Sequence, residues 1–198
     1  MKTFFFFGDS LTLGVNDPEH LGWVGRLCSG ARLPVPPTTF YNLGARKHSS
    51  HNILKRWKTE VTARRLPESD VRLLFCFGTV DMVGADHATV LPAPLSLQNF
   101  STLLREVAEH HETRRVRVLS PFPVAHEEHC RRIRHIGSAY AELAQGRGVE
   151  YVDIFPALAA DPVYMGDLAD GVHPGAAGCA RVSSALLAHD SMKAWLYL

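Results

Sequence analysis

The chain has 198 residues, of which 46% are hydrophobic and 21% charged, and its formal net charge is +1. This apolar fraction excludes a disordered chain, and 21 basic residues against 20 acidic ones argue against a nucleic-acid or membrane-surface protein held by bulk charge. No apolar run approaches the ~20 residues of a membrane span, and the phenylalanine run at residues 4–7 is too short for a signal-peptide core. We expect one cytoplasmic domain covering residues 1–198, with no nucleic-acid and no membrane partner.

Short apolar runs alternate along the chain with segments of helical period. In chain order the expected elements are a strand at 3–7, a helix ending near residue 30, a strand at 39–43, a helix around 53–61, a strand at 71–77, a helix around 97–107, a strand at 116–119, a helix around 130–143, a strand at 149–154 and a helix at 176–187. Strands that alternate with helices indicate βαβ units and a parallel sheet covered on both faces. The predicted fold class is α/β, a three-layer α/β/α domain with a five-stranded parallel sheet.

Small, polar and titratable residues gather where the carboxyl ends of the predicted strands meet, which is the edge where such sheets bind ligands. They form four segments, Gly8-Asp9-Ser10-Leu11, Asn42-Leu43-Gly44-Ala45-Arg46, Gly78-Thr79-Val80-Asp81 and Asp170-Gly171-Val172-His173-Pro174. Each segment alone has an ordinary interpretation, such as Ser10 serving as a turn or helix-capping serine. Their shared placement predicts a functional site.

Asp170 and His173 form an Asp-x-x-His pair. A carboxylate three residues before a histidine can accept its Nδ1–H, which leaves Nε2 as a base toward a serine hydroxyl such as that of Ser10. The order Ser, Asp, His is also that of α/β hydrolases, but no G-x-S-x-G motif is present, which disfavours that fold. The pattern predicts nucleophilic catalysis.

In this order, the four segments resemble the GDSL family of esterases and lipases, also called SGNH hydrolases, from residue 3 to about 187. The resemblance implies the flavodoxin-like SGNH-hydrolase fold and a serine esterase that needs no cofactor. Its substrate would be a small acyl ester or thioester. Ser10 would be the nucleophile, His173 the general base and acid, and Asp170 the carboxylate that orients His173. The backbone N–H groups of Ser10 and Gly44 would hold the oxyanion.

The third segment departs from the family pattern Gly-x-Asn-Asp, in which the Asn side chain supplies a third oxyanion donor. Val80 stands at that position, and losing one such donor typically costs ~10²–10³ in turnover. Arg46 and Thr79 are candidate replacements, so these two residues and Val80 are the expected substrate-binding residues. Arg46 is interpreted equally well as a solvated surface residue, and Thr79 more readily as a packing residue.

Val80 also leaves rival functions open. One is a degenerate SGNH fold that binds an acylated or carboxylated ligand without turning it over. Another is an acyltransferase, which would use the same residues and pass the acyl group to an alcohol or amine. Because Ser10, Asp170 and His173 are all present, we favour the esterase.

Two histidine-rich segments raise other interpretations. His126-Glu127-Glu128-His129 lacks the i, i+4 histidine spacing of zinc proteases, and the four cysteines form no C-x-x-C pair. We therefore expect no metal site and no disulfide framework. His110 and His111 are predicted to lie in the last turn of a helix, where cationic side chains suit the helix dipole.

Overall fold

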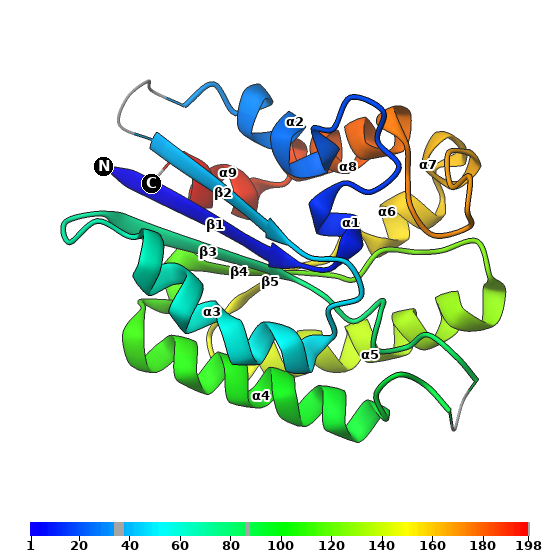
Figure 1. Ribbon diagram of the computed structural model, residues 1–198, viewed down its shortest axis with the longest axis horizontal. Coiled ribbons are helices and arrows are strands. Elements are labelled where there is room, and N and C mark those ends of the chain that lie inside the picture. The colour runs from blue at the N-terminus through cyan, green and yellow to red at the C-terminus, as the bar shows by residue number, and fades with distance from the viewer. Residues whose placement is uncertain (34–37, 86–87, 198) are drawn as a thin grey trace.

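The computed structural model describes residues 1–33, 38–85 and 88–197, and a five-stranded sheet lies at its centre (Figure 1). Its strands are β1 (Lys2–Gly8), β2 (Thr38–Gly44), β3 (Asp70–Cys76), β4 (Val116–Leu119) and β5 (Glu150–Val152). All neighbouring strands are parallel, in the order β2-β1-β3-β4-β5. The predicted α/β fold class is confirmed.

Helices cover both faces of the sheet (Figure 1). One face carries α2 (Gly22–Gly30), α6 (Phe155–Ala159), α7 (Pro162–Gly166), α8 (Ala176–Ala188) and α9 (Asp190–Tyr197). The other face carries α3 (Ser50–Arg64), α4 (Ala93–His110) and α5 (Glu127–Gln145). A 3₁₀ turn, η1 (Thr113–Arg115), precedes β4.

The phenylalanines of β1 show how one strand joins the two layers. Successive side chains of a strand point to opposite faces. Phe4 and Phe6 therefore pack in the core under α2, α8 and α9, whereas Phe5 and Phe7 pack in the core under α3, α4 and α5. All four are fully buried, so an uninterrupted apolar run is what a central parallel strand requires.

The carboxyl ends of β1, β2 and β3 lie level, because Gly8 pairs with both Gly44 and Cys76. The short helix α1 (Ser10–Leu13) is seated against this edge. A Cβ on Gly8 would collide with the Thr12 side chain, and a Cβ on Gly44 would collide with the Leu13 backbone. Two glycines therefore permit the close approach that positions α1.

Several elements differ from the sequence prediction. The strand expected at 149–154 is only Glu150–Val152, because Val149 N–H bonds to the carbonyl of Ala144 and Ile154 already caps α6. The segment between this strand and α8, to which the sequence prediction assigns no helix, contains α6 and α7. The helix α9 was not predicted.

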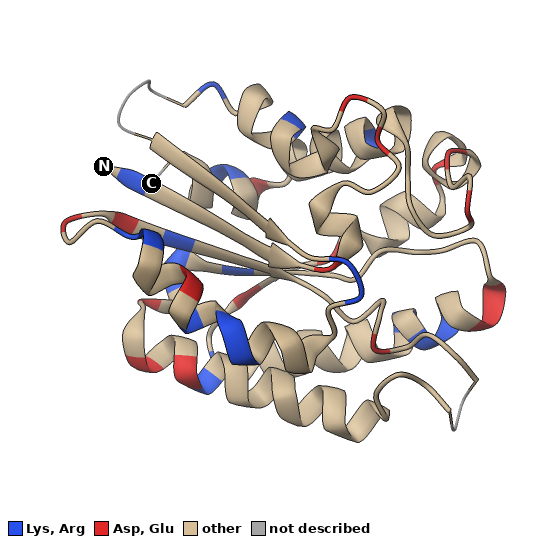
Figure 2. Cartoon of the chain, in the orientation of Figure 1, with Lys and Arg blue, Asp and Glu red and all other residues tan. Residues whose placement is uncertain are grey.

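Charged side chains are spread over the helices and loops and do not form a face of one sign (Figure 2). A basic segment lies in the loop after β2, next to the carboxyl edge of the sheet. Among the described helices, none combines the length and apolarity that crossing a bilayer requires.

Candidate active site

Ser10 is the first residue of α1, directly after β1. The helix is capped by Asp9, whose carboxylate accepts the Leu11 N–H at 2.9 Å, and it ends at Gly14 with a left-handed φ of 87°. The first N–H groups of a helix have no intrahelical acceptor, so the turn presents backbone donors at the end of the sheet. This arrangement places the Ser10 hydroxyl and its own N–H at the carboxyl edge.

His173 reaches Ser10 from the opposite end of the chain. Its Nε2 lies 2.7 Å from Ser10 Oγ, and its Nδ1 lies 2.7 Å from Asp170 Oδ2. The other oxygen of Asp170 accepts the backbone N–H groups of Val172 at 3.0 Å and His173 at 2.8 Å. The structure therefore brings the three predicted triad residues together, with the carboxylate clamped to the loop that carries the imidazole.

The loop of Asp170 and His173 is itself held in place. Leu168 and Pro174 form an antiparallel bridge, and the carbonyl of Gly171 accepts the N–H of Ala125 at 2.8 Å. Asp167 Oδ2 accepts the N–H of Gly178 at 2.6 Å near the start of α8. These contacts fix the loop between α7 and α8.

The Asp170 carboxyl remains charged. Partial burial acts to raise its pKa, but the backbone and side-chain hydrogen bonds from His173 and the N–H of Val172 outweigh burial and hold the pKa well below its usual range. Its side chain is 45% exposed, against 16% for His173. A permanently charged carboxylate at Nδ1 fixes the tautomer in which Nε2 faces the serine.

The second segment lies at the carboxyl end of β2, next to α1. The Gly44 N–H donates to Asn42 Oδ1 at 3.0 Å, and Asn42 Nδ2 donates to the carbonyl of Thr12 at 2.9 Å. Asn42 thus joins the end of β2 to α1 and occupies the amide that we assigned to the oxyanion. The missing Cβ of Gly44 is accounted for by Leu13, which packs against it.

Arg46 is exposed and has no carboxylate partner among the described residues. It lines a cavity of about 520 Å³ together with Leu13, Val15 and His20. The N–H of Val15 bonds to the carbonyl of Ser10 at 3.1 Å, so this cavity adjoins the turn that carries the serine. The placement is consistent with a substrate-binding role for Arg46.

The third segment offers no side-chain donor at its expected position. Val80 is partly exposed in a turn closed by two backbone bonds, Met82 N–H to Gly78 and Val83 N–H to Val80. Thr79 is buried, and its carbonyl accepts a hydrogen bond from His129 Nε2 at 2.9 Å. Thr79 therefore packs locally rather than facing the cavity near Arg46.

Sequence reasoning gave no role to Asp81, which is fully buried beneath the site. Its carboxylate accepts the Ser50 N–H at 2.8 Å, the Ser96 hydroxyl at 2.5 Å and the Tyr140 hydroxyl at 3.3 Å. These bonds connect the third segment to α3, α4 and α5. The available signal was an aspartate in the turn that follows an apolar strand.

Asp9 is also buried under the active edge, and its carboxyl has an altered pKa. Burial raises the pKa from 3.8 to about 7; the Leu11 N–H opposes this, and the nearby charge of Asp81 adds to it. The result is a carboxyl group directly before the nucleophile that carries a proton over part of the neutral range.

The segment of residues 126–129 has structural contacts of its own. His126 caps α5 by accepting the N–H of His129 at 3.3 Å, while the His129 ring bonds to Thr79. Within residues 1–33, 38–85 and 88–197, no group of three or more His, Cys, Asp or Glu side chains is placed to hold a metal ion. All four cysteines are free thiols.

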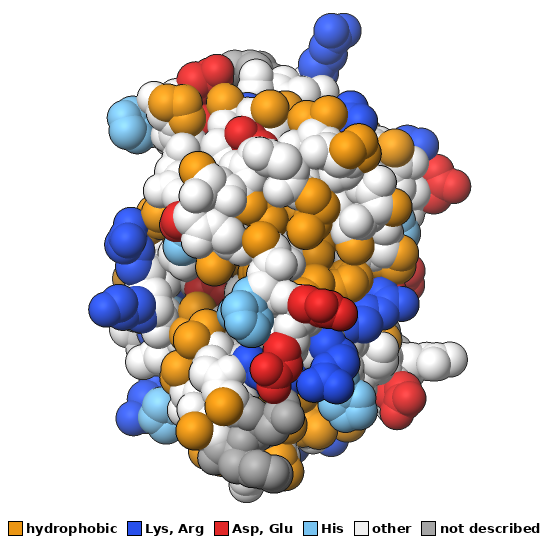
Figure 3. All heavy atoms as spheres, turned by 90° about the vertical axis from the view of Figure 1, so that its right-hand side faces the viewer, with side chains coloured by type: hydrophobic (Ala, Val, Ile, Leu, Met, Phe, Trp, Pro, Cys, Tyr) orange, Lys and Arg blue, Asp and Glu red, His pale blue; other side chains and the backbone are white. Residues whose placement is uncertain are grey.

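Figure 3 shows the carboxyl edge of the sheet, where hydrophobic side chains gather near the middle and basic side chains lie toward both sides. Leu13 and Val83 are among the exposed large hydrophobic residues, at 41% and 43%. Met82, the neighbour of Val83 in the chain, is buried in the core. This face of the molecule thus combines apolar groups with charged groups of both signs.

Comparison with known proteins gives one family and several similar folds. The model of the GDSL-like lipase/acylhydrolase family matches residues 6–181. Among curated protein sequences, none matches this chain significantly.

Three solved structures illustrate the structural similarity. A member of the lipolytic protein G-D-S-L family from Veillonella parvula has a TM-score of 0.74 at 16% identity, covering 94% of this chain and 97% of its own. The esterase EstA from a Pseudoalteromonas species, inhibited by monoethylphosphonate, has a TM-score of 0.74 at 16% identity and 100% coverage of both chains. A mutant of Axe2, an acetyl-xylooligosaccharide esterase from Geobacillus stearothermophilus, has a TM-score of 0.76 at 17% identity, covering 96% of this chain and 94% of its own. These similarities show a shared fold.

Proposed function

The chain belongs to the GDSL-like lipase/acylhydrolase family, and from that premise we propose that it is a serine esterase for small acyl esters or thioesters. The observation that carries the proposal is the continuous hydrogen-bonded series Asp170–His173–Ser10, with 2.7 Å at each of its two steps. A serine within hydrogen-bond distance of a histidine that is itself oriented by a carboxylate is the arrangement that activates a hydroxyl nucleophile. The location in the cytoplasm stays a prediction.

In the proposed reaction, Ser10 Oγ attacks the carbonyl carbon of the ester while His173 Nε2 takes the hydroxyl proton. The Asp170 carboxylate stabilises the resulting imidazolium. Collapse of the tetrahedral intermediate breaks the bond to the leaving group, which receives the proton from His173 and departs as an alcohol or thiol. Water, deprotonated by His173, then attacks the acyl-enzyme and releases the acid and the free Ser10 hydroxyl.

The oxyanion of this reaction needs donors at the edge of the sheet. We propose the Ser10 N–H as one donor and the Gly44 N–H as a second, which becomes free when the Asn42 side chain turns away from its present 3.0 Å bond. Val80 adds none. Arg46, across the adjoining cavity, is the proposed contact for a polar or anionic part of the substrate.

The test is hydrolysis of short p-nitrophenyl esters by the wild type and by Ser10→Ala. Removing one member of such a triad typically costs at least about 10³-fold in turnover, so Ser10→Ala should be nearly inactive. Ser138→Ala, an exposed serine on α5, is the matched control and should retain full activity. Equal rates for wild type and Ser10→Ala would refute the nucleophile assignment.

A covalent probe separates catalysis from background hydrolysis. A p-nitrophenyl phosphonate ester should add one phosphonyl group to the wild type, detected by mass spectrometry, and none to Ser10→Ala. Labelling of the wild type at another residue would also contradict the proposal.

Val80 is the specific observation that favours a second candidate, a ligand-binding protein of the same fold. The missing donor weakens turnover while leaving the cavity beside Arg46 intact. Tight binding of a carboxylated ligand without measurable turnover would support this candidate. An acyltransferase is separated from both by analysing products in the presence of alcohol or amine acceptors.

A further inference from the structure

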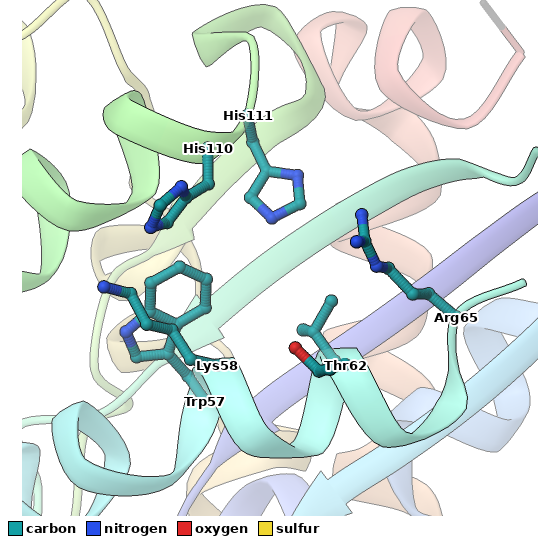
Figure 4. Close-up of a pocket in the computed structure, with 7 residues that line it drawn as sticks. Trp57, Lys58, Thr62, Arg65, His110 and His111 are labelled. Carbon is teal, nitrogen blue, oxygen red and sulfur yellow. The ribbon is translucent and has the colours of Figure 1, made fainter. Parts of the chain in front are cut away.

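A second pocket lies at the other end of α3, away from the triad. It has a volume of about 300 Å³ and is open between the second half of α3 and the end of α4 (Figure 4). The first residue of α3, Ser50, contacts Asp81 under the active edge. Because a helix rises about 1.5 Å per residue, Arg65 at the far end is about 20 Å from that edge. The pocket is therefore separate from the proposed esterase site.

The pocket is lined mainly by basic and aromatic side chains. In Figure 4, Lys58, His110 and His111 lie around Trp57, and the hydroxyl of Thr62 points toward the same space. Arg65 lines the other end of the pocket, beyond Thr62. The centroids of the two imidazole rings lie 6.5 Å and 6.1 Å from that of the indole. No acidic residue is among the described residues that line the pocket.

The ion pairs around this pocket are incomplete. Arg64, on the same helix turn, is paired with Glu60, whereas Arg65 has no carboxylate partner in the described part of the chain. Lys58 Nζ lies 3.4 Å from Glu106 Oε2, and the Trp57 Nε1–H donates to the same oxygen at 3.3 Å. The pocket thus combines one unpaired guanidinium with one partly neutralised ammonium.

The pKa of His111 reflects burial first and the surrounding positive charges second. It is lowered from 6.5 to about 4, first by burial and then by the charges of His110, Arg65 and Arg115. Arg115 has its own carboxylate partner in Asp70 at 3.0 Å. Helix C-termini attract cations, which explains why basic residues collect at the end of α4. The helix dipole does not explain why the described residues that line this open pocket include several basic side chains and no acidic one.

We propose that this pocket binds the phosphate group of a small organic phosphate monoester. A phosphate dianion offers several acceptor oxygens, which match the Arg65 guanidinium, the Lys58 ammonium, the Thr62 hydroxyl and a histidine ring N–H. The volume of about 300 Å³ is at the lower end for small-molecule sites, and Trp57 supplies a flat apolar surface for an organic ring. The site is a binding site distinct from the catalytic serine.

Calorimetric titration of the full-length protein with AMP, adenosine and inorganic phosphate at constant ionic strength tests the proposal. AMP should bind with a Kd below about 1 mM, and Arg65→Ala should weaken it about tenfold or more, because a charged hydrogen bond is lost. Arg105→Gln, an exposed arginine of α4 that does not line the pocket, is the control and should bind like the wild type. Ester hydrolysis should be unchanged in Arg65→Ala.

The three ligands distinguish the source of the phosphate. Tighter binding of AMP than of inorganic phosphate supports a phosphate monoester, while equal binding of both supports the same phosphate site with free phosphate as its occupant. Binding of adenosine as tight as AMP, binding retained in Arg65→Ala, or no saturation by any of the three would overturn the proposal. A proton-NMR titration adds a local readout, because bound phosphate should raise the pKa of His111.

Discussion

Asp170 and Asp9 are carboxyl groups on two sides of the same serine, and their surroundings move their pKa values in opposite directions. Asp170 is 45% exposed and accepts two backbone N–H groups and the His173 ring, which hold its pKa below the usual range even though partial burial opposes them. Asp9 is buried beside Asp81, and its pKa is raised to about 7. Hydrogen-bond donors lower the pKa of Asp170, whereas loss of solvent raises the pKa of Asp9.

The two carboxyl groups therefore suit different roles. A carboxylate that stays charged can stabilise an imidazolium, so Asp170 suits a role in proton transfer. A carboxyl that is costly to ionise suits a structural role, and Asp9 caps the helix that carries Ser10. The hydrogen-bond donors around a carboxyl group therefore indicate its role better than its position next to the nucleophile in the sequence does.

Within this pair of carboxyl groups, the largest effect is expected for Asp170→Asn. An asparagine can present its amide N–H groups to Nδ1 and favour the wrong imidazole tautomer, so turnover of p-nitrophenyl acetate should fall about 10²–10³-fold. The loss should be smaller than for a fully buried carboxylate, because solvent screens the charge of the half-exposed Asp170 side chain. Asp161→Asn, at an aspartate that caps α7 and pairs with Arg181, is the matched control.

The control should leave turnover within about twofold of the wild type, since Asp161 touches neither Ser10 nor His173. A change of less than about threefold in Asp170→Asn would show that the Asp170–His173 bond has no part in catalysis.

A second, smaller effect concerns Asp9 and stability. A carboxyl whose folded pKa is raised binds its proton more tightly in the folded state, so the folded protein loses stability as the pH rises from about 4 to 7. Asp9→Asn keeps an oxygen for the Leu11 N–H but cannot ionise. The free energy of unfolding of Asp9→Asn minus that of the wild type should be about 2–3 kcal/mol larger at pH 8 than at pH 5.

Urea unfolding at the two pH values measures this difference. Asp170→Asn serves as the comparison. The folded pKa of Asp170 is lowered, so the stability that this carboxylate contributes is lost only when the pH falls below the usual pKa of an aspartate. It should show no such trend between pH 5 and pH 8. A flat difference for Asp9→Asn as well would mean that Asp9 is charged in the folded protein throughout this range.

Much of the fold could be predicted from local patterns. The buried phenylalanine run of β1 and the apolar stripes of α4 and α5 each carry their own periodicity, and the rule that ligands bind at the carboxyl edge of parallel strands brought Ser10 to His173 across 163 residues. The short helices α6 and α7 have five residues each, too few for a period to show. Asp161 followed by Pro162 was nevertheless a readable helix start.

The details of the site depended on tertiary contacts that no pattern contains. Asn42 bonds to the carbonyl of Thr12 because α1 and β2 meet there, and Asp9 acquires its high pKa because α1 covers it next to Asp81. The residue types at these positions were visible in the sequence. Their burial and partners were set by segments far apart in the chain.

The third segment resembles Asp9 rather than Asp170, because its carboxyl group, Asp81, is bound within the protein. Its Val80 presents no hydrogen-bond donor toward the serine. Val80→Asn places an amide N–H at this position. If the fold retains a sound triad, the added donor should raise turnover by about tenfold, below the ~10²–10³ of a donor optimised in place, because the surrounding turn was not selected to aim it.

Val80→Ala is the control that separates the donor from the space it occupies. It removes the bulk of the valine and adds no N–H group, so its turnover should stay close to that of the wild type. Steady-state kinetics on p-nitrophenyl acetate distinguish the two: a donor acting on the oxyanion raises kcat, since that bond strengthens as negative charge develops, whereas relief of crowding lowers KM. An equal gain in both variants would assign the effect to crowding, and no gain in either would move the balance toward the ligand-binding candidate.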